Sequence, residues 1–497
     1  MGENSCLYKI TKNDQLGRYI IAAKNIKQGQ LILKENPVIL CPQIGGCTIC
    51  FNCCAQIKKV QFCSECAVAV LCSSECKGQF HTPQECSVII KKTPIKREDL
   101  LTNPEIVTPF RYLLWRHFNK ELFQAVLQLE NHLELRRDSQ IWRRTHINVE
   151  NVLHELKMVD DADLKNEIVQ KICAVLDINT FEVRQPQRNR SGFNPGENLR
   201  GLYLSAAMMA HDCVANVHLA VDDEFVLYVH AAVDIPEGAP ILFNYANVLQ
   251  GNEERQSQLK DGKYFFCSCS RCTDPTELGT EMSSLKCPRC HKGFIRPKSW
   301  QCSLCQRIYH SSLIKMTLAE CRRRIDEIRS PDIRTLEKLL QKLSFTFHPH
   351  HYLILEVEQN LIGLYTQSPP ETKNLRRKIE MCNKFLDIFR KIEPGISRIQ
   401  AIGLYELHSA VVSLAERIYK SKETDKEGFM KMLLLAESTL KNSIKSLLYE
   451  PVKSPEGRLA QNALSELKML RATISNFQSE EKKVEKKKSN KGNKKKK

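Results

Sequence analysis

Residues 265–272, FFCSCSRC, decide the fold, because they place three cysteines in a C-x-C-x2-C spacing. Zinc in a structural site takes four tetrahedral ligands, so the thiolates of Cys267, Cys269 and Cys272 leave the set one ligand short. The missing ligand must come from elsewhere in the chain, and Cys213, in the sequence His211-Asp212-Cys213, is the best placed candidate. The spacing therefore predicts that two segments far apart in the sequence meet around one metal ion.

Two further cysteine groups have the spacing of zinc sites. The first combines thiolates with one imidazole, a ligand set that fits two tetrahedral zinc ions: Cys50, Cys53, Cys63, Cys66, Cys72, Cys76, His81 and Cys86. The second has the two C-x2-C pairs of a zinc ribbon: Cys287, Cys290, Cys302 and Cys305. Segments this small cannot bury a sufficient core, so metal binding would supply their folding energy. The three groups together predict about four zinc ions.

The ligand set of the first group has one open alternative. Cys47 also forms a C-x2-C pair with Cys50, and Cys54 is an extra thiol. The pair Cys50 and Cys53 is preferred because it leaves the shorter gap to Cys63. Cys47 remains the substitute ligand.

The composition narrows the class of protein. With 497 residues, 42% of them hydrophobic and 26% charged, the chain is neither collagen-like nor disordered throughout. No run approaches the ~20 apolar residues of a membrane span, so we expect no membrane contact. The first residues, MGENSC, show no secretory signal pattern. We therefore expect an intracellular protein, in which the clustered members of its 22 cysteines hold metal rather than form disulfides.

The hydrophobic pattern predicts strands and helices in separate parts of the chain, which is typical of an α+β fold. β-branched runs predict strands at residues 19–23 and 30–33 and again within 217–245. Apolar residues recur at helical spacing in residues 87–178 and in residues 312–475. The last residues are a low-complexity stretch of Lys and Glu, for which disorder is predicted.

In this order, the motifs resemble the SMYD family of protein-lysine methyltransferases, in which a MYND zinc module splits a SET domain. Residues 17–29 resemble the opening SET strands and their glycine-containing loop, and residues 200–216 resemble the family's N-H-x-C-x-P-N segment. Residues 241–245, ILFNY, resemble the strand that ends in the active-site tyrosine. Residues 272–280 with the ribbon that follows resemble the arthropod SmydA-type subgroup.

The resemblance implies a SET-type β-clip split by a MYND insert, with a zinc ribbon and an all-helical TPR-like C-terminal domain. The expected units are the SET N-terminal part (1–46), the MYND module (47–86), a helical insert (87–178), the SET core (179–250), a post-SET zinc segment (251–280), the ribbon (281–311), the TPR-like domain (312–475) and a Lys-rich tail (476–497).

By the same resemblance, the cofactor is S-adenosyl-L-methionine and the catalytic residue is Tyr245. The family's cofactor-binding positions fall on Gly17, Arg18, Tyr19, Asn179, Ala210, His211, Tyr245 and Phe265. Phe265 is preferred over Phe266 because the count from Tyr245 to Cys267 then matches the family without a gap.

Three positions depart from the family pattern. Ala210 stands where the family has Asn, Ala215 replaces a proline, and Tyr19 replaces a glycine. An alanine cannot donate the hydrogen bond of an asparagine, which weakens the expected cofactor site. The alternative is therefore a catalytically silent SET and MYND zinc adaptor in a transcriptional repressor complex. A zinc-finger nucleic-acid binder is disfavoured, because the cysteine modules lack interposed readout residues.

The resemblance also implies partners. We expect a protein substrate with a target lysine, and proline-containing peptides of transcriptional regulators at the MYND module. The tail, residues 479–497, holds ten lysines and three glutamates, which favours nuclear import or non-specific attraction to nucleic acid. We expect a monomer that acts on histone or non-histone proteins in the nucleus and cytoplasm.

Overall fold

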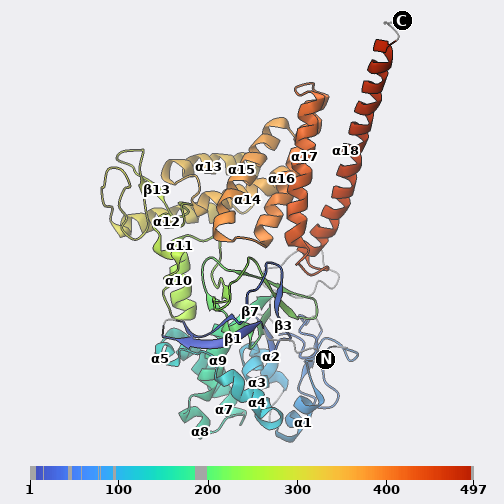
Figure 1. Ribbon diagram of the computed structural model, residues 1–497. Coiled ribbons are helices and arrows are strands. Elements are labelled where there is room, and N and C mark those ends of the chain that lie inside the picture. Colours follow the sequence, from blue (N-terminus) through green and yellow to red (C-terminus); the bar gives the residue numbers. More distant parts are fainter. Residues whose placement is uncertain are drawn as a thin grey trace.

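The computed structural model describes residues 7–14, 16–42, 48–57, 59–76, 78, 80–92, 97–184 and 199–493. In Figure 1, short strands lie between a group of helices at the bottom and a second, larger group at the top. The helix α10 (Asn252–Lys263) leads from the strands to the upper group. This mixture confirms the predicted α+β class.

The β core is built from segments on both sides of a long insertion. Its strands are β1 (Tyr8–Asn13), β2 (Gly17–Ala22), β3 (Leu31–Glu35), β4 (Ile39–Pro42), β7 (Thr180–Val183), β8 (Leu199–Leu202), β9 (Ala210–His211), β10 (Val217–Val221), β11 (Leu227–Ala231) and β12 (Leu242–Phe243). They form small sheets in the orders β1-β2, β10-β11-β3, β4-β8-β7 and β12-β9. β-branched and aliphatic side chains on their inner faces make one buried core that includes Ile20, Ile32 and Val229.

The pairing of these strands joins the two sides of the insertion. β3 pairs with β11, and β4 pairs with β8, both antiparallel. The residues between β4 and β7 are therefore an insertion into one β unit. Figure 1 shows the inserted helices packed together below the strands.

The insertion begins with the cysteine-rich module and continues as short helices. The module holds β5 (Gln61–Phe62) and β6 (Val70–Leu71) and is followed by α1 (Pro83–Lys92). The helices after it are α2 (Arg97–Thr102), η1 (Pro104–Ile106), α3 (Val107–Phe118), α4 (Lys120–Leu127), α5 (Leu133–Arg136), α6 (Gln140–Thr145), η2 (His146–Glu150), α7 (Asn151–Glu155), α8 (Asp161–Lys165) and α9 (Ile168–Asn179). Side-chain caps fix several of their starts, among them Asn119 before α4 and Ser139 before α6.

After the β core come the second cysteine segment and the ribbon. The segment contains α11 (Ser270–Thr273), whereas η4 (Ala206–Met208) lies within the β core, between β8 and β9. The ribbon contains the antiparallel pair β13 (Leu285–Lys286) and β14 (Phe294–Ile295). Its buried Trp300 packs in a core shared with the following helices, so the ribbon is part of the upper group.

The C-terminal region is helical. Its helices are α12 (Ser311–Asp326), α13 (Ile333–Thr346), α14 (Tyr352–Gln367), α15 (Thr372–Ile392), α16 (Arg398–Lys420), α17 (Lys426–Leu447) and α18 (Pro455–Asn493). From α13 onward each helix packs against the next one in sequence. Asp332, Ser397 and Asp425 cap α13, α16 and α17 with their side chains.

The predicted disorder of the Lys-rich segment is wrong for residues 476–493, because α18 continues through them to Asn493. Figure 1 shows this helix projecting beyond the rest of the molecule. Lys and Glu are strong helix formers, and the segment contains no proline. The first turns of α18 are anchored by buried residues such as Ala463, and the helix continues from them without an apolar repeat in the Lys-rich segment.

Candidate active site and metal centres

All sixteen predicted metal ligands lie in four groups, within each of which the ligand atoms lie within 4.8 Å of one another. The groups are Cys50, Cys53, Cys72 and Cys76; Cys63, Cys66, His81 and Cys86; Cys213, Cys267, Cys269 and Cys272; and Cys287, Cys290, Cys302 and Cys305. The closest sulfur pairs in these groups are 3.5 to 4.0 Å apart. Two sulfurs bound tetrahedrally at ~2.3 Å from one zinc lie about 3.8 Å apart, so each group has the size of a closed zinc site.

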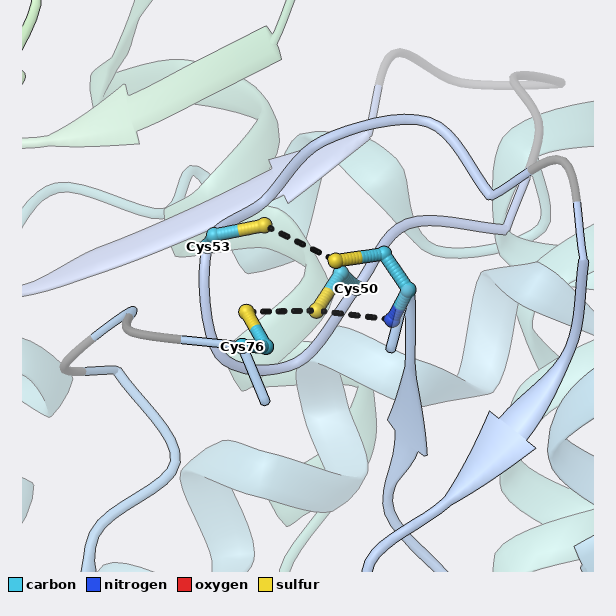
Figure 2. A group of neighbouring side chains, drawn as sticks. Cys50, Cys53 and Cys76 are labelled. Atoms are coloured by element: carbon cyan, nitrogen blue, oxygen red, sulfur yellow. Dashed lines mark hydrogen bonds between the residues drawn. The ribbon is translucent and has the colours of Figure 1, made fainter. Parts of the chain in front are cut away.

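The two groups of the first module alternate along the sequence. The first and third ligand pairs share one site, and the second and fourth pairs share the other. Figure 2 shows the side chains of Cys50, Cys53 and Cys76 turned toward one common point. The N–H of Cys72 donates to the Cys50 sulfur at 3.3 Å, which stabilises a thiolate there. The alternative ligand Cys47 lies outside the described residues.

The one imidazole ligand is held by a buried ion pair. Nδ1 of His81 lies 2.7 Å from Glu85, whose other contacts are two nitrogens of Arg111 at 2.6 and 3.1 Å. Burial alone would raise the pKa of the Glu85 carboxyl, but the contacts with Arg111 and His81 are stronger, so its pKa lies below the ordinary value. The carboxylate therefore fixes the ring with Nε2 turned toward Cys66, 3.7 Å away.

In the third group, Cys213 lies with the three cysteines of residues 265–272, and the group contacts the segment that carries His211. Nε2 of His211 lies 3.4 Å from the Cys213 sulfur, and Nδ1 accepts the backbone N–H of Tyr245 at 3.0 Å. Nδ1 is an acceptor, so the ring proton lies on Nε2 and points at the sulfur. Burial lowers the pKa of His211 to about 4, which agrees with a neutral ring.

The segments that carry His211 and Tyr245 run side by side. β9 and β12 pair in parallel, with Ala210 opposite Leu242 and His211 opposite Phe243. The side chain of Asn216 locks the pair, because its amide donates to Pro240 and its carbonyl oxygen accepts the N–H of Leu242. This pairing therefore fixes the position of His211, on β9, relative to Tyr245, which follows β12.

A cavity of about 1280 Å³ opens beside this pair of segments. The predicted site residues that line it are Gly17, Arg18, Asn179, Ala210, His211, Tyr245 and Phe265. They come from five separate parts of the sequence. The cavity continues toward the C-terminal helices, where Arg398 and Glu450 line it.

Tyr245 lies between an imidazole ring and a phenylalanine ring in this cavity. Its ring centroid is 5.1 Å from that of His211 and 6.1 Å from that of Phe243. Its hydroxyl donates to the carbonyl of Met209. Burial raises the pKa of the Tyr245 phenol, so the hydroxyl stays protonated near neutral pH.

The two neighbouring phenylalanines have opposite environments. Phe265 lines the cavity, with its ring 5.7 Å from that of His211. Phe266 is 67% exposed, and Lys260 lies over its ring. The structure thus places the preferred residue, and not its neighbour, at the cavity.

Gly17 provides open space at the cavity wall. Its φ is +66°, a left-handed conformation that favours glycine, and a Cβ placed there meets no atom within 4 Å. Arg18 donates to the carbonyl of Gln128 and so ties β2 to the inserted helices. Side chains alternate along a strand, and Tyr19 accordingly turns away from Arg18 to accept a bond from Asn13. Tyr19 is therefore not brought into the cavity.

Asn179 lines the cavity, but its side-chain NH2 group donates both of its hydrogen bonds to backbone carbonyls of the protein. Its Nδ2 donates to the carbonyls of Glu130 at 2.7 Å and Val175 at 2.8 Å. These bonds fix the end of α9 against the loop after α4. The NH2 group of Asn179 is therefore already bonded and is not available to a ligand in the cavity.

Sequence reasoning missed Lys263 at this site. Its Nζ lies 5.4 Å from the ring centroid of Tyr245 and donates to the carbonyl of Ile178. No spacing signal pointed to it, because Lys263 is the last residue of α10 and the left-handed Tyr264 separates it from Phe265. Glu85 and Arg111 were also missed; Glu85 follows its histidine by one helical turn.

A search of the described helices for a stretch long and apolar enough to cross a bilayer finds none.

Comparisons with known proteins agree with this arrangement. The SET domain family matches residues 17–246. The SET domain-containing protein SmydA-8, isoform A, of Drosophila melanogaster is 26% identical over 413 residues, which cover 78% of this chain and 85% of the relative. A SET and MYND domain-containing protein of Dictyostelium discoideum is 26% identical over 267 residues, 49% of this chain and 76% of the relative.

A third relative carries an enzyme's name. Human histone-lysine N-methyltransferase SMYD3 is 24% identical over 267 residues, which cover 52% of this chain and 59% of the relative. The matched SET region spans the inserted cysteine module, as the strand pairing across the insertion requires. By the SET match and these relatives together, the chain is similar to proteins of the SMYD family, and a SmydA-type protein of Drosophila is among its relatives.

Proposed function

We propose that the protein is an S-adenosylmethionine-dependent protein-lysine N-methyltransferase. The observation that carries the proposal is the cavity in which Tyr245, His211, Phe265 and Gly17 meet. The name of the human relative supports lysine as the acceptor. We propose histone and non-histone proteins as the substrate class.

The residues at the cavity fit the cofactor. Phe265 offers an aromatic face to an adenine, and the backbone of residues 210–211 lies beside it. Gly17 leaves room where any side chain would narrow the wall. The cavity of about 1280 Å³ exceeds what a single small ligand needs, and thus leaves space for an entering lysine.

When bound, the cofactor supplies a methyl group on a positively charged sulfur. The protonated hydroxyl of Tyr245 is fixed by its bond to Met209, so its oxygen is free to accept an N–H of a neutral acceptor amine. That bond orients the amine's lone pair, and the enclosing rings exclude water. The amine must lose its proton before transfer, since a protonated amine has no lone pair.

We propose that the four ligand groups hold zinc with a structural role. Each is a closed four-ligand set without an open position for substrate. The post-SET ion would fix residues 267–272 and through them Phe265. We further propose that the MYND module binds proline-containing peptides of transcriptional regulators, and that the protein works in the nucleus and cytoplasm.

A second candidate function is a silent zinc adaptor in a repressor complex. Ala210 favours it, because this buried residue lines the cavity without a polar side chain. Two observations oppose it: the His211 bonds to Cys213 and Tyr245 are intact, and Phe265 still faces the cavity. We therefore retain the enzyme as the first proposal.

The test is transfer of a tritiated methyl group from S-adenosylmethionine to purified core histones. Loss of the Tyr245 hydroxyl in Tyr245→Phe should lower the rate about 100-fold or more. Tyr405→Phe is the matched control, because this hydroxyl bonds Glu466 on the helical domain, away from the cavity. Equal rates in wild type and Tyr245→Phe would contradict the assignment of Tyr245.

A further inference from the structure

Lys263 is a half-buried lysine on the wall of the cavity. Its Nζ lies 5.4 Å from the ring centroid of Tyr245, and one N–H bonds the carbonyl of Ile178. The residue lines the same cavity as His211 and Phe265. Its amine is thus already next to the hydroxyl-bearing ring that an acceptor lysine must reach.

Two other lysines with little exposure each pair with a carboxylate. Nζ of Lys378, 3% exposed, pairs with Glu406 at 2.6 Å, and Lys384 pairs with Glu358. Among the described residues, no carboxylate pairs with Lys263. Lys263 instead bonds a backbone carbonyl and lies near an aromatic ring, so no paired carboxylate of the described residues offsets its ammonium form at the cavity wall.

The charged groups around Lys263 leave its amine free to be neutral. The carboxylate that acts on Lys263 is Asp177 on α9, which Arg136 and Arg200 already hold at 2.9 and 3.1 Å. Burial lowers the pKa of Lys263 to about 8, and the charge of Arg200 on β8 acts in the same direction. At pH 7 about a tenth of the molecules therefore carry a neutral amine, and at pH 9 most do.

We infer that Lys263 is a self-methylation site, a methyl acceptor within the chain's own active site. The inference rests on the proposed function. The lone pair of the neutral Nζ forms a bond to the methyl carbon, the carbon–sulfur bond breaks, and its electron pair stays on the sulfur. The surplus proton then leaves Nζ to solvent. The bond to Ile178 holds one N–H, so the lone pair can point into the cavity.

The reaction within one molecule has a distinct kinetic signature. Because acceptor and site belong to the same chain, the fraction of Lys263 modified per minute should not change when the protein is diluted tenfold. Transfer between molecules would slow in proportion to concentration.

The experiment uses the full-length, zinc-loaded protein incubated with S-adenosylmethionine that carries a deuterated methyl group. Peptide mass spectrometry should find the label on Lys263, at a rate about tenfold higher at pH 9 than at pH 7. Lys378 and the exposed Lys260 are internal controls and should stay unlabelled. Lys263→Arg should abolish the label, and circular dichroism shows whether that variant is folded.

A second readout needs no cofactor. Competitive labelling of the protein alone with acetic anhydride over a pH series should show Lys263 with a pKa of about 8, below the ordinary lysine value. An ordinary titration of Lys263 would overturn the inference.

The outcomes separate the inference from the proposed function. Label on histones with none on Lys263 overturns the inference and leaves the enzyme intact. No label on either acceptor, together with no detectable cofactor binding, overturns both.

Discussion

Ala210 departs from the polar residue expected at the proposed cofactor site. It lines the cavity on β9, beside His211, and its methyl group offers no hydrogen bond. Ala210→Asn should strengthen S-adenosylmethionine binding roughly fivefold or more, because one buried hydrogen bond contributes about 1 kcal/mol. Isothermal titration of both proteins measures the change.

The control for this variant is Ala215→Asn, which adds the same side chain elsewhere on the cavity wall. An equal gain in both variants, or a loss of affinity in Ala210→Asn, would show that position 210 does not limit binding.

We expect Glu85 and Arg111 to control the affinity of the His81-containing ligand group for zinc. Glu85→Gln removes the charge that pairs with Arg111 and orients His81. Loss of such a partner should weaken that zinc ion about 10- to 100-fold. Competition with a zinc-binding dye should show one ion of the four released early, whereas Glu65→Gln, in the same module, should release none.

At this scale the sequence predicted the residues whose chemistry is visible in residue type and spacing. The spacing of the cysteine pairs indicates that they bind metal, and the missing ligand could be inferred because tetrahedral zinc takes four ligands. Glu85, Arg111 and Lys263 could not be found this way, since their roles depend on contacts between separate elements. Tyr19 failed for a related reason, because the face of a strand follows from its pairing.

Among the elements, the pair β9 and β12 connects metal binding with the cavity. His211 bonds the Cys213 sulfur with one ring nitrogen and the Tyr245 backbone with the other. Removing the post-SET zinc should therefore displace both Tyr245 and Phe265. We expect chelator-treated protein to lose S-adenosylmethionine binding at least tenfold while α12–α18 keep most of the helical circular dichroism signal.

Zinc content and cofactor affinity should be measured on the same chelator-treated samples, and added zinc should restore binding. A zinc-free protein with unchanged affinity would refute the link through His211.

Helices and strands were predictable to different depths. The amphipathic runs in residues 87–178 and 312–475 do form helices, because their apolar spacing matches one buried face. The strand pairs across the insertion could not be read from periodicity, which gives no partner or register. The tail was mispredicted because composition alone does not reveal a helix that extends outward from a packed start.

For the whole molecule, the junction between the β core and the helical domain is a close contact. Gly395 has φ +79°, and a Cβ there would lie 1.8 Å from the carbonyl of Ala232. Gly395→Ala should therefore destabilise the protein by about 1–3 kcal/mol, from backbone strain and the clash. Denaturant unfolding measures the loss.

Gly363 is the matched control, because a Cβ on this α14 residue meets no atom within 4 Å. Gly363→Ala should be neutral or stabilise the helix by up to about 1 kcal/mol. If both variants unfold at the same denaturant concentration, the junction does not contribute as the contact implies.

The central claim, that the shared cavity binds S-adenosylmethionine, is tested most directly by calorimetric titration of the zinc-loaded protein with this cofactor. The account predicts binding that falls about tenfold or more in Phe265→Ala, where an aromatic stack is lost. Phe266→Ala should bind as wild type does, because this ring is 67% exposed. No heat of binding at millimolar cofactor, or equal losses in the two variants, would contradict the account.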